Sequence, residues 1–152
     1  MKGVVEMAAT TQYPIVFKSG WVHNDELSWS HLVGNHRTVS EDAGTVCGMM
    51  SIDEMFDVNA VARIEFIRNE LELKRGAILM DAHGRILVHV VNALLGYVGR
   101  GPALSEMICD AVGIPTEIFE AIQNEAFGIK PYAIALWRTS PSEWDWERLP
   151  KE

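Results

Sequence analysis

The sequence lacks the residue patterns that identify most catalytic and metal centres. Only 2 of its 152 residues are cysteines, Cys47 and Cys109, which are too few for a disulfide framework or a cysteine-rich zinc site. Reduced thiols in a cytoplasmic protein are the simplest interpretation. No stretch matches a phosphate-binding loop, a dinucleotide-binding G-x-G-x-x-G or a G-x-S-x-G nucleophile elbow. We therefore expect no cofactor and assign no catalytic residue.

Long apolar segments are missing as well. The longest apolar run, residues 86–98, is shorter than the roughly 20 residues that a membrane-spanning helix needs, and His89 and Asn92 interrupt it. The first residues do not show the apolar core of a secretory signal peptide. These two absences predict a soluble, cytoplasmic protein that does not associate with membranes.

Basic residues are outnumbered by acidic ones. The chain has 13 Lys and Arg against 21 Asp and Glu, a net charge of −8, which opposes a general attraction to nucleic acids or anionic lipids. With 48% hydrophobic and 22% charged residues, the composition is that of an ordinary globular domain. We expect one domain over residues 1–152, with residues 1–12 and 139–152 as loose ends.

A pattern typical of a long amphipathic helix is present at residues 52–73. Ser51 and Glu54 have the S-x-x-E spacing of a capping box, in which the two side chains satisfy backbone N–H groups. Because residues in steps of three or four share one helical face, the pattern predicts a helix that ends near Lys74, with Gly76 as its C-terminal cap. The apolar positions are Ile52, Phe56, Ala60, Ile64, Ile67 and Leu71.

A hairpin is predicted next. Residues 77–80 and 85–91 are two apolar runs, and the intervening Asp81-Ala82-His83-Gly84 is typical of a turn because Gly84 tolerates positive φ. The alternative is a buried helix over residues 86–97, since apolar residues there also share a helical face. We favour a strand to Val90, followed by a short helix to Val98.

Two further helices are predicted in the C-terminal half. Pro102 and Gly113 bound the first, and Pro115 and Gly128 bound the second. Their spacing is that of a helix-turn-helix, the geometry of many DNA-binding regulators.

The predicted fold class is α+β, a small antiparallel sheet covered by a central amphipathic helix and a C-terminal helical pair. Besides the hairpin, residues 15–22 and 130–138 are the expected strands. The predicted core consists of Phe56, Ile64, Ile67, Leu79, Ile86, Val88, Ile108, Phe119, Ile122 and Leu136.

DNA binding by the helical pair is one alternative function. A recognition helix must offer donors to phosphates and base edges. The second helix instead carries Glu117, Glu120 and Glu125, with no Lys or Arg before Lys130. We therefore prefer a helical hairpin that packs in the core.

A small enzyme with a His/Asp or His–metal site is the other alternative. His23, His31 and His36 have donors suited to a first-row metal, but their spacings of eight and five residues match no metal-binding motif. No metal ligand is assigned, because loop histidines with local hydrogen bonds are the simpler interpretation.

Asp81 and His83 with His89 are a second possible set. A turn aspartate and a hydrogen-bonded sheet histidine are the simpler interpretation of these residues. Cys47 and Cys109 are expected to be small buried residues rather than nucleophiles, because no neighbouring base lowers the pKa of either thiol.

The C-terminal tail suggests the leading hypothesis for function. Trp144 and Trp146 would share one face of an extended chain, beside Glu143 and Asp145. Trp is favoured at interface hot spots and an acidic rim selects a basic partner, although Trp that packs on its own core is the commoner case. We expect a non-catalytic interaction or regulatory module that binds a protein with a basic surface or associates with itself, and that binds no nucleic acid and no membrane.

Overall fold

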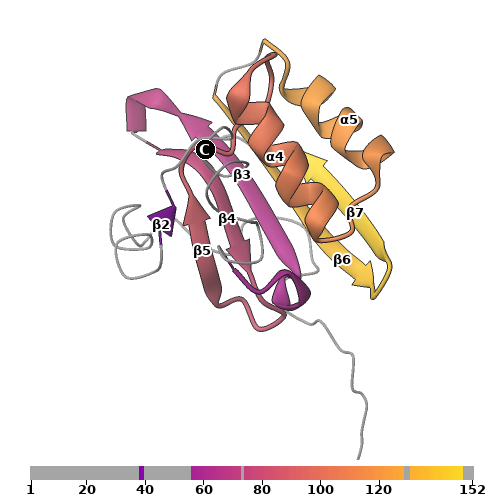
Figure 1. The fold of residues 1–152 in the computed structure, drawn as a ribbon. Helices are drawn as coiled ribbons and strands as arrows, with labels where there is room; N and C mark the ends of the chain where they lie inside the picture. Colours follow the sequence, from indigo (N-terminus) through magenta and orange to yellow (C-terminus); the bar gives the residue numbers. More distant parts are fainter. Residues whose placement is uncertain (1–37, 40–55, 73, 129–130, 149–152) are drawn as a thin grey trace, which may run out of the picture.

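One sheet organises the part of the chain that the computed structural model describes, residues 38–39, 56–72, 74–128 and 131–148. Five antiparallel strands lie in the order β5-β4-β3-β6-β7, and the short strand β2 pairs parallel with β5 (Figure 1). The strands are β2 (Thr38–Val39), β3 (Arg63–Asn69), β4 (Lys74–Met80), β5 (Ile86–Val90), β6 (Tyr132–Ser140) and β7 (Glu143–Arg148). The helices are α4 (Arg100–Ala111) and α5 (Thr116–Ala126), with the 3-10 turns η1 (Val58–Ala60) and η2 (Glu70–Glu72) on either side of β3. No helix among the described residues is long and apolar enough to cross a membrane.

The predicted architecture is wrong at its centre. Residues 56–72 do not form the expected central helix; they form η1, the strand β3 and η2. The described part of the chain is therefore mostly sheet. α4 and α5 follow the first strands of this sheet in the chain, and they do not form the predicted cover together with a central helix. The expected capping box at residues 51–54 and the expected strand at 15–22 lie outside the described residues.

The position of β3 in the middle of the sheet explains this error. β3 pairs with β4 on one side and with β6 on the other, and it buries both faces. Ile64 and Phe66 point to one face and Arg63 and Glu65 to the other, all at 0% exposure. A strand that is buried on both faces does not alternate between apolar and exposed polar residues. The apolar residues of this segment therefore also recur at intervals of three and four, which is the spacing of residues on one face of a helix. Leu71, expected on that face, is 98% exposed.

Gly76, the expected helix cap, lies inside β4. Its φ is +108°, in the region that favours glycine, and a Cβ atom there would lie 2.4 Å from the carbonyl oxygen of Val90. The close approach of β4 to β5 therefore requires glycine at this position.

The predicted hairpin is confirmed. β4 and β5 pair antiparallel, and Gly84 in the turn has a φ of +85°. The Asp81 carboxylate accepts hydrogen bonds from the backbone N–H groups of His83, at 2.9 Å, and Arg85, at 3.0 Å. This side chain thus closes the turn in the manner expected of aspartate.

The short helix expected between Val90 and Val98 is wrong, since turns and bends occupy this stretch. The backbone N–H of Leu95 donates to the Tyr132 hydroxyl at 2.9 Å, and that of Gly96 donates to the Gln123 side chain at 2.8 Å. These N–H groups bond to β6 and α5 rather than to carbonyls one helical turn earlier. Tertiary hydrogen bonds thus replace the local ones that a helix needs.

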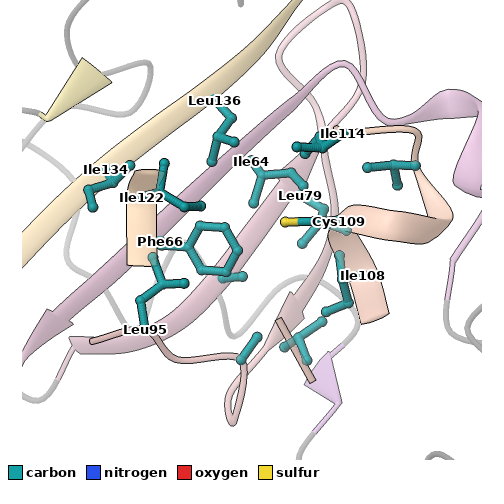
Figure 2. Close-up of a cluster of buried hydrophobic side chains, with 14 of the residues drawn as sticks. Ile64, Phe66, Leu79, Leu95, Ile108, Cys109, Ile114, Ile122, Ile134 and Leu136 are labelled. Carbon is teal, nitrogen blue, oxygen red and sulfur yellow. The ribbon is translucent and has the colours of Figure 1, made fainter. Parts of the chain in front are cut away.

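Side chains from the helices and from one sheet face share a single core. In Figure 2, Ile108 of α4 and Ile122 of α5 lie in the same cluster as Phe66 of β3 and Leu136 of β6. Nine of the ten predicted core residues are buried, and Ile86 is half-buried. Burial was predicted better than secondary structure because it follows from apolar character alone.

His89 is buried on the other face of the sheet, as its alternation with Val88 and Val90 requires. It is 4% exposed, and its Nε2 lies 2.8 Å from the carbonyl oxygen of Arg75. Burial lowers the pKa of His89 below its ordinary value of 6.5, and this effect outweighs the Arg75 hydrogen bond, which raises the pKa. The imidazole is therefore neutral at pH 7.

Replacing Ile64 and Leu71 separately tests the strand against the helix. Ile64→Ala removes a side chain at 0% exposure and should lower the free energy of unfolding by about 3 kcal/mol. Leu71→Ala removes an exposed one and should change it by less than about 0.5 kcal/mol. Urea denaturation of both variants measures the difference. Equal losses would support the single helical face that the sequence suggested.

Acid should destabilise the fold through His89. Because the folded-state pKa is lowered, the unfolded chain binds the proton more readily, and stability falls as the pH drops from about 6.5 toward the folded-state pKa. His89→Gln keeps a donor for the Arg75 carbonyl but does not titrate. The loss in melting temperature between about pH 7.5 and about pH 5 should be smaller in this variant than in the wild type; an identical loss would assign the pH dependence to other groups.

Candidate functional site

A groove between α4 and α5 is a candidate binding site among the described residues. It is partly open to solvent and has a volume of about 370 Å³. Cys109, Ile114 and Phe119 are buried at its floor, while Glu106 and Asp110 are exposed at its rim. Ala103, Met107 and Thr116 complete the lining. The groove thus combines an apolar floor with carboxylates at its edge.

The turn between the helices builds the floor. Gly113 takes a φ of +87°, which lets α4 end in a tight turn, and the backbone N–H of Ile114 donates to the carbonyl of Cys109 at 2.9 Å. This bond turns Ile114 back toward α4. α5 then starts after Pro115, whose carbonyl accepts from the N–H of Phe119 at 3.1 Å. Glycine and proline therefore mark the end of α4 and the start of α5.

The groove is electrostatically negative. Burial raises the pKa of the Cys109 thiol, and the carboxylates of Glu106 and Asp110 raise it further. The thiol is thus protonated at neutral pH and is not a nucleophile. Cys109 is 1% exposed, so the expectation that it is a small buried residue is confirmed.

The tail residues predicted as a binding site form β7. Trp144 and Trp146 do share one face, but that face points to the core, since they pair with Arg138 and Leu136 of β6. Trp144 is 7% exposed, and Trp146 is half-buried against the core. Glu143 and Asp145 point the other way and are exposed. Their role in partner binding stays a prediction.

Arg138 fixes Trp144 in place. The guanidinium lies 4.6 Å from the centre of the Trp144 ring, a cation–π contact. It also donates to three backbone carbonyls, those of Val61 and Val112 at 3.1 Å and of Pro141 at 2.7 Å. One side chain therefore joins the start of β3, the end of α4 and the β6–β7 turn above the indole.

Asp145 satisfies part of the backbone of β7, the last strand of the sheet. Its carboxylate accepts a hydrogen bond from the N–H of Trp146 at 2.8 Å. A capped N–H and alternating acidic side chains both discourage an added strand. β7 is thus poorly suited to edge-to-edge pairing with another sheet.

The histidine sets do not form a site in the described part of the chain. His83 is exposed in the hairpin turn, while His89 is buried on β5, as the simpler interpretation predicted. Within residues 38–39, 56–72, 74–128 and 131–148, no three His, Cys, Asp or Glu side chains gather in a way that would hold a metal ion. His23, His31, His36 and Cys47 lie outside these residues.

The helical pair was predicted, but its groove was not. Both helices are confirmed, and Glu117 and Glu120 of α5 are exposed, which opposes contact with a polyanion. Glu106 and Asp110 follow each other at i and i+4 with Met107 between them. This spacing places two carboxylates on one side of a helix and is the only local signal of the groove.

Comparison of the chain with protein-family models, with curated proteins and with solved structures finds no match in any of the three. The shape and charge of the groove are therefore the basis for inferring a function.

Proposed function

We propose that the protein is a non-catalytic protein-interaction module that binds a basic, amphipathic segment of a partner in the groove between α4 and α5. The observation that carries this proposal is the combination of a buried apolar floor, including Phe119, with the exposed carboxylates of Glu106 and Asp110. Apolar side chains of a partner gain from burial in such a groove, and its basic side chains pair with the rim.

The wider charge of the helices supports the same kind of partner. Residues 100–128 contain five acidic residues and one basic residue, Arg100. Charges of one sign around an apolar groove steer an oppositely charged segment toward it and discourage partners of like charge. The acids are Glu106, Asp110, Glu117, Glu120 and Glu125.

The groove suits this role better than the tail does. A hot-spot residue must reach the partner, and Trp144 is 7% exposed beneath Arg138. The groove has a volume of about 370 Å³, at the lower end of the range of about 300–1,000 Å³ that is usual for binding pockets. A few apolar side chains of a helical or extended segment fit this volume.

Charge reversal at the rim tests the proposal. The probe is a fluorescein-labelled helical peptide with leucines on one face and lysines on the other, and fluorescence anisotropy measures its Kd. Glu106→Lys combined with Asp110→Lys should weaken binding about tenfold, because two attractive charge pairs become repulsive. Both residues are exposed, so the fold should tolerate the change.

Charge reversal on the tail is the matched control. Glu143→Lys combined with Asp145→Lys changes the net charge equally, outside the groove, and should weaken binding less than about twofold, mainly through long-range charge. If the tail variant weakens peptide binding more than the groove variant does, the peptide binds at β7 instead of in the groove. If neither pair changes the Kd, or if a lysine-free peptide binds as tightly, the proposed function fails.

A further inference from the structure

The large hydrophobic side chains that the described residues expose all lie at one end of the sheet. They are Leu71 at 98%, Val98 at 91% and Phe127 at 55% exposure. Leu71 is in η2 between β3 and β4, Val98 precedes α4, and Phe127 follows α5. Figure 1 shows these three connections toward its upper end, away from the hairpin turn between β4 and β5. We call this region the loop end.

Direct contacts hold the three connections together. The N–H of Gly128 donates to the carbonyl of Gly96 at 3.2 Å, which ties the chain after α5 to the chain before α4. The Arg68 guanidinium lies 5.8 Å from the centre of the Tyr97 ring and donates to the Glu70 carboxylate at 2.7 Å. These contacts fix the three connections relative to one another, so their exposed side chains belong to one ordered surface.

The loop end is basic in an acidic protein. Residues 68–75 and 96–100 contain four basic and two acidic residues, whereas the whole chain carries −8. Arg75 and Arg100 are exposed, and Arg68 and Lys74 are half-buried. Arg75 and Arg68 are direct cross-strand partners, and the Arg75 guanidinium donates to the Val91 carbonyl at 3.4 Å and to the Asn92 side chain at 3.3 Å. Of the two acids, Glu70 is paired with Arg68.

We propose that the loop end docks on the surface of an anionic lipid bilayer. Leu71, Val98 and Phe127 enter the boundary between headgroups and acyl chains, and Arg75 and Arg100 bind lipid phosphates and carboxylates. Apolar insertion and electrostatic attraction to anionic lipids are the two terms that hold peripheral proteins at a membrane. This surface is distinct from the groove between α4 and α5 and does not depend on the function proposed for it.

The shape of the loop end favours a bilayer over a nucleic acid or a protein. The apolar side chains stand on three separate connections, and a fluid surface accepts separate protruding residues without a complementary shape. A nucleic acid would use the arginines but would offer no apolar medium to Leu71 and Val98. An acidic protein would need pockets to receive them.

Sedimentation with vesicles tests the proposal, using phosphatidylcholine vesicles with and without phosphatidylserine. The wild type should bind the phosphatidylserine vesicles and be released by salt. Leu71→Ser combined with Val98→Ser should weaken binding at least about tenfold through lost apolar insertion. Arg75→Gln combined with Arg100→Gln should weaken it about tenfold or more through lost charge.

Arg85→Gln is the control, because Arg85 is an exposed base in the hairpin turn at the far end of β4. This variant should bind vesicles as the wild type does, and circular dichroism should show all variants folded. The proposal is overturned if the wild type does not bind phosphatidylserine vesicles, or if the variant with Leu71→Ser and Val98→Ser binds them as tightly as the wild type. Equal binding to duplex DNA that depends on the arginines alone would assign the surface to nucleic acid instead. Peptide binding in the groove should change by less than about twofold in every variant, which separates this test from that of the proposed function.

Discussion

The burial of both faces of β3 is the constraint on which the rest of the fold depends. On one face Arg63 and Glu65 form an ion pair of 2.8 Å with both side chains at 0% exposure, and Arg63 lies 5.8 Å from the centre of the Trp137 ring. Residues two apart on a strand share a face, so a slip of one residue would move both charges into the apolar core around Phe66. Placing two charged groups among apolar side chains costs the desolvation of both ions. The pair therefore contributes less to stability than to the choice of one register, the one in which Arg63 faces Trp137.

This constraint explains which elements were predictable. α4 and α5 are bounded by glycine and proline, and the β4–β5 hairpin has Gly84 in its turn. The backbone preferences of these residues act locally, and all three elements were predicted correctly. β3 has no such signal. Ile64 and Ile67 fit a helical face as well as they fit a strand, and only the neighbouring strands decide between the two. The capping-box spacing of Ser51 and Glu54 also favoured the helix that was predicted over residues 52–73. Two residues at a fixed spacing are weak evidence, because the pairing of a strand with both of its neighbours outweighs them.

The candidate sites show the same division between local and tertiary information. That Trp144 and Trp146 share a face follows from alternation, but that this face points inward follows from the pairing of β7 with β6, which sets Trp146 beside the core residue Leu136. The groove floor brings Cys109 together with Phe119 through a turn whose angle no spacing specifies. Net charge alone does not predict the candidate sites either. The total of −8 is the sum over an acidic surface on the two helices, a basic loop end and the rest of the chain.

The distribution of charges along α4 is an independent reason to look for partners at the groove and at the loop end. A helix is stabilised by acids near its N-terminus and by bases near its C-terminus. α4 has the reverse, with Arg100 at its start, Asp110 in its last turn, no acid in the first turn and no base in the last. This arrangement opposes helix stability, so helix formation does not explain it. Arg100 and Asp110 are separated by ten residues, about 15 Å along the axis, or roughly two screening lengths at physiological salt. If the two proposals hold, a basic segment in the groove and an anionic surface at the loop end would contact the same helix with little mutual interference.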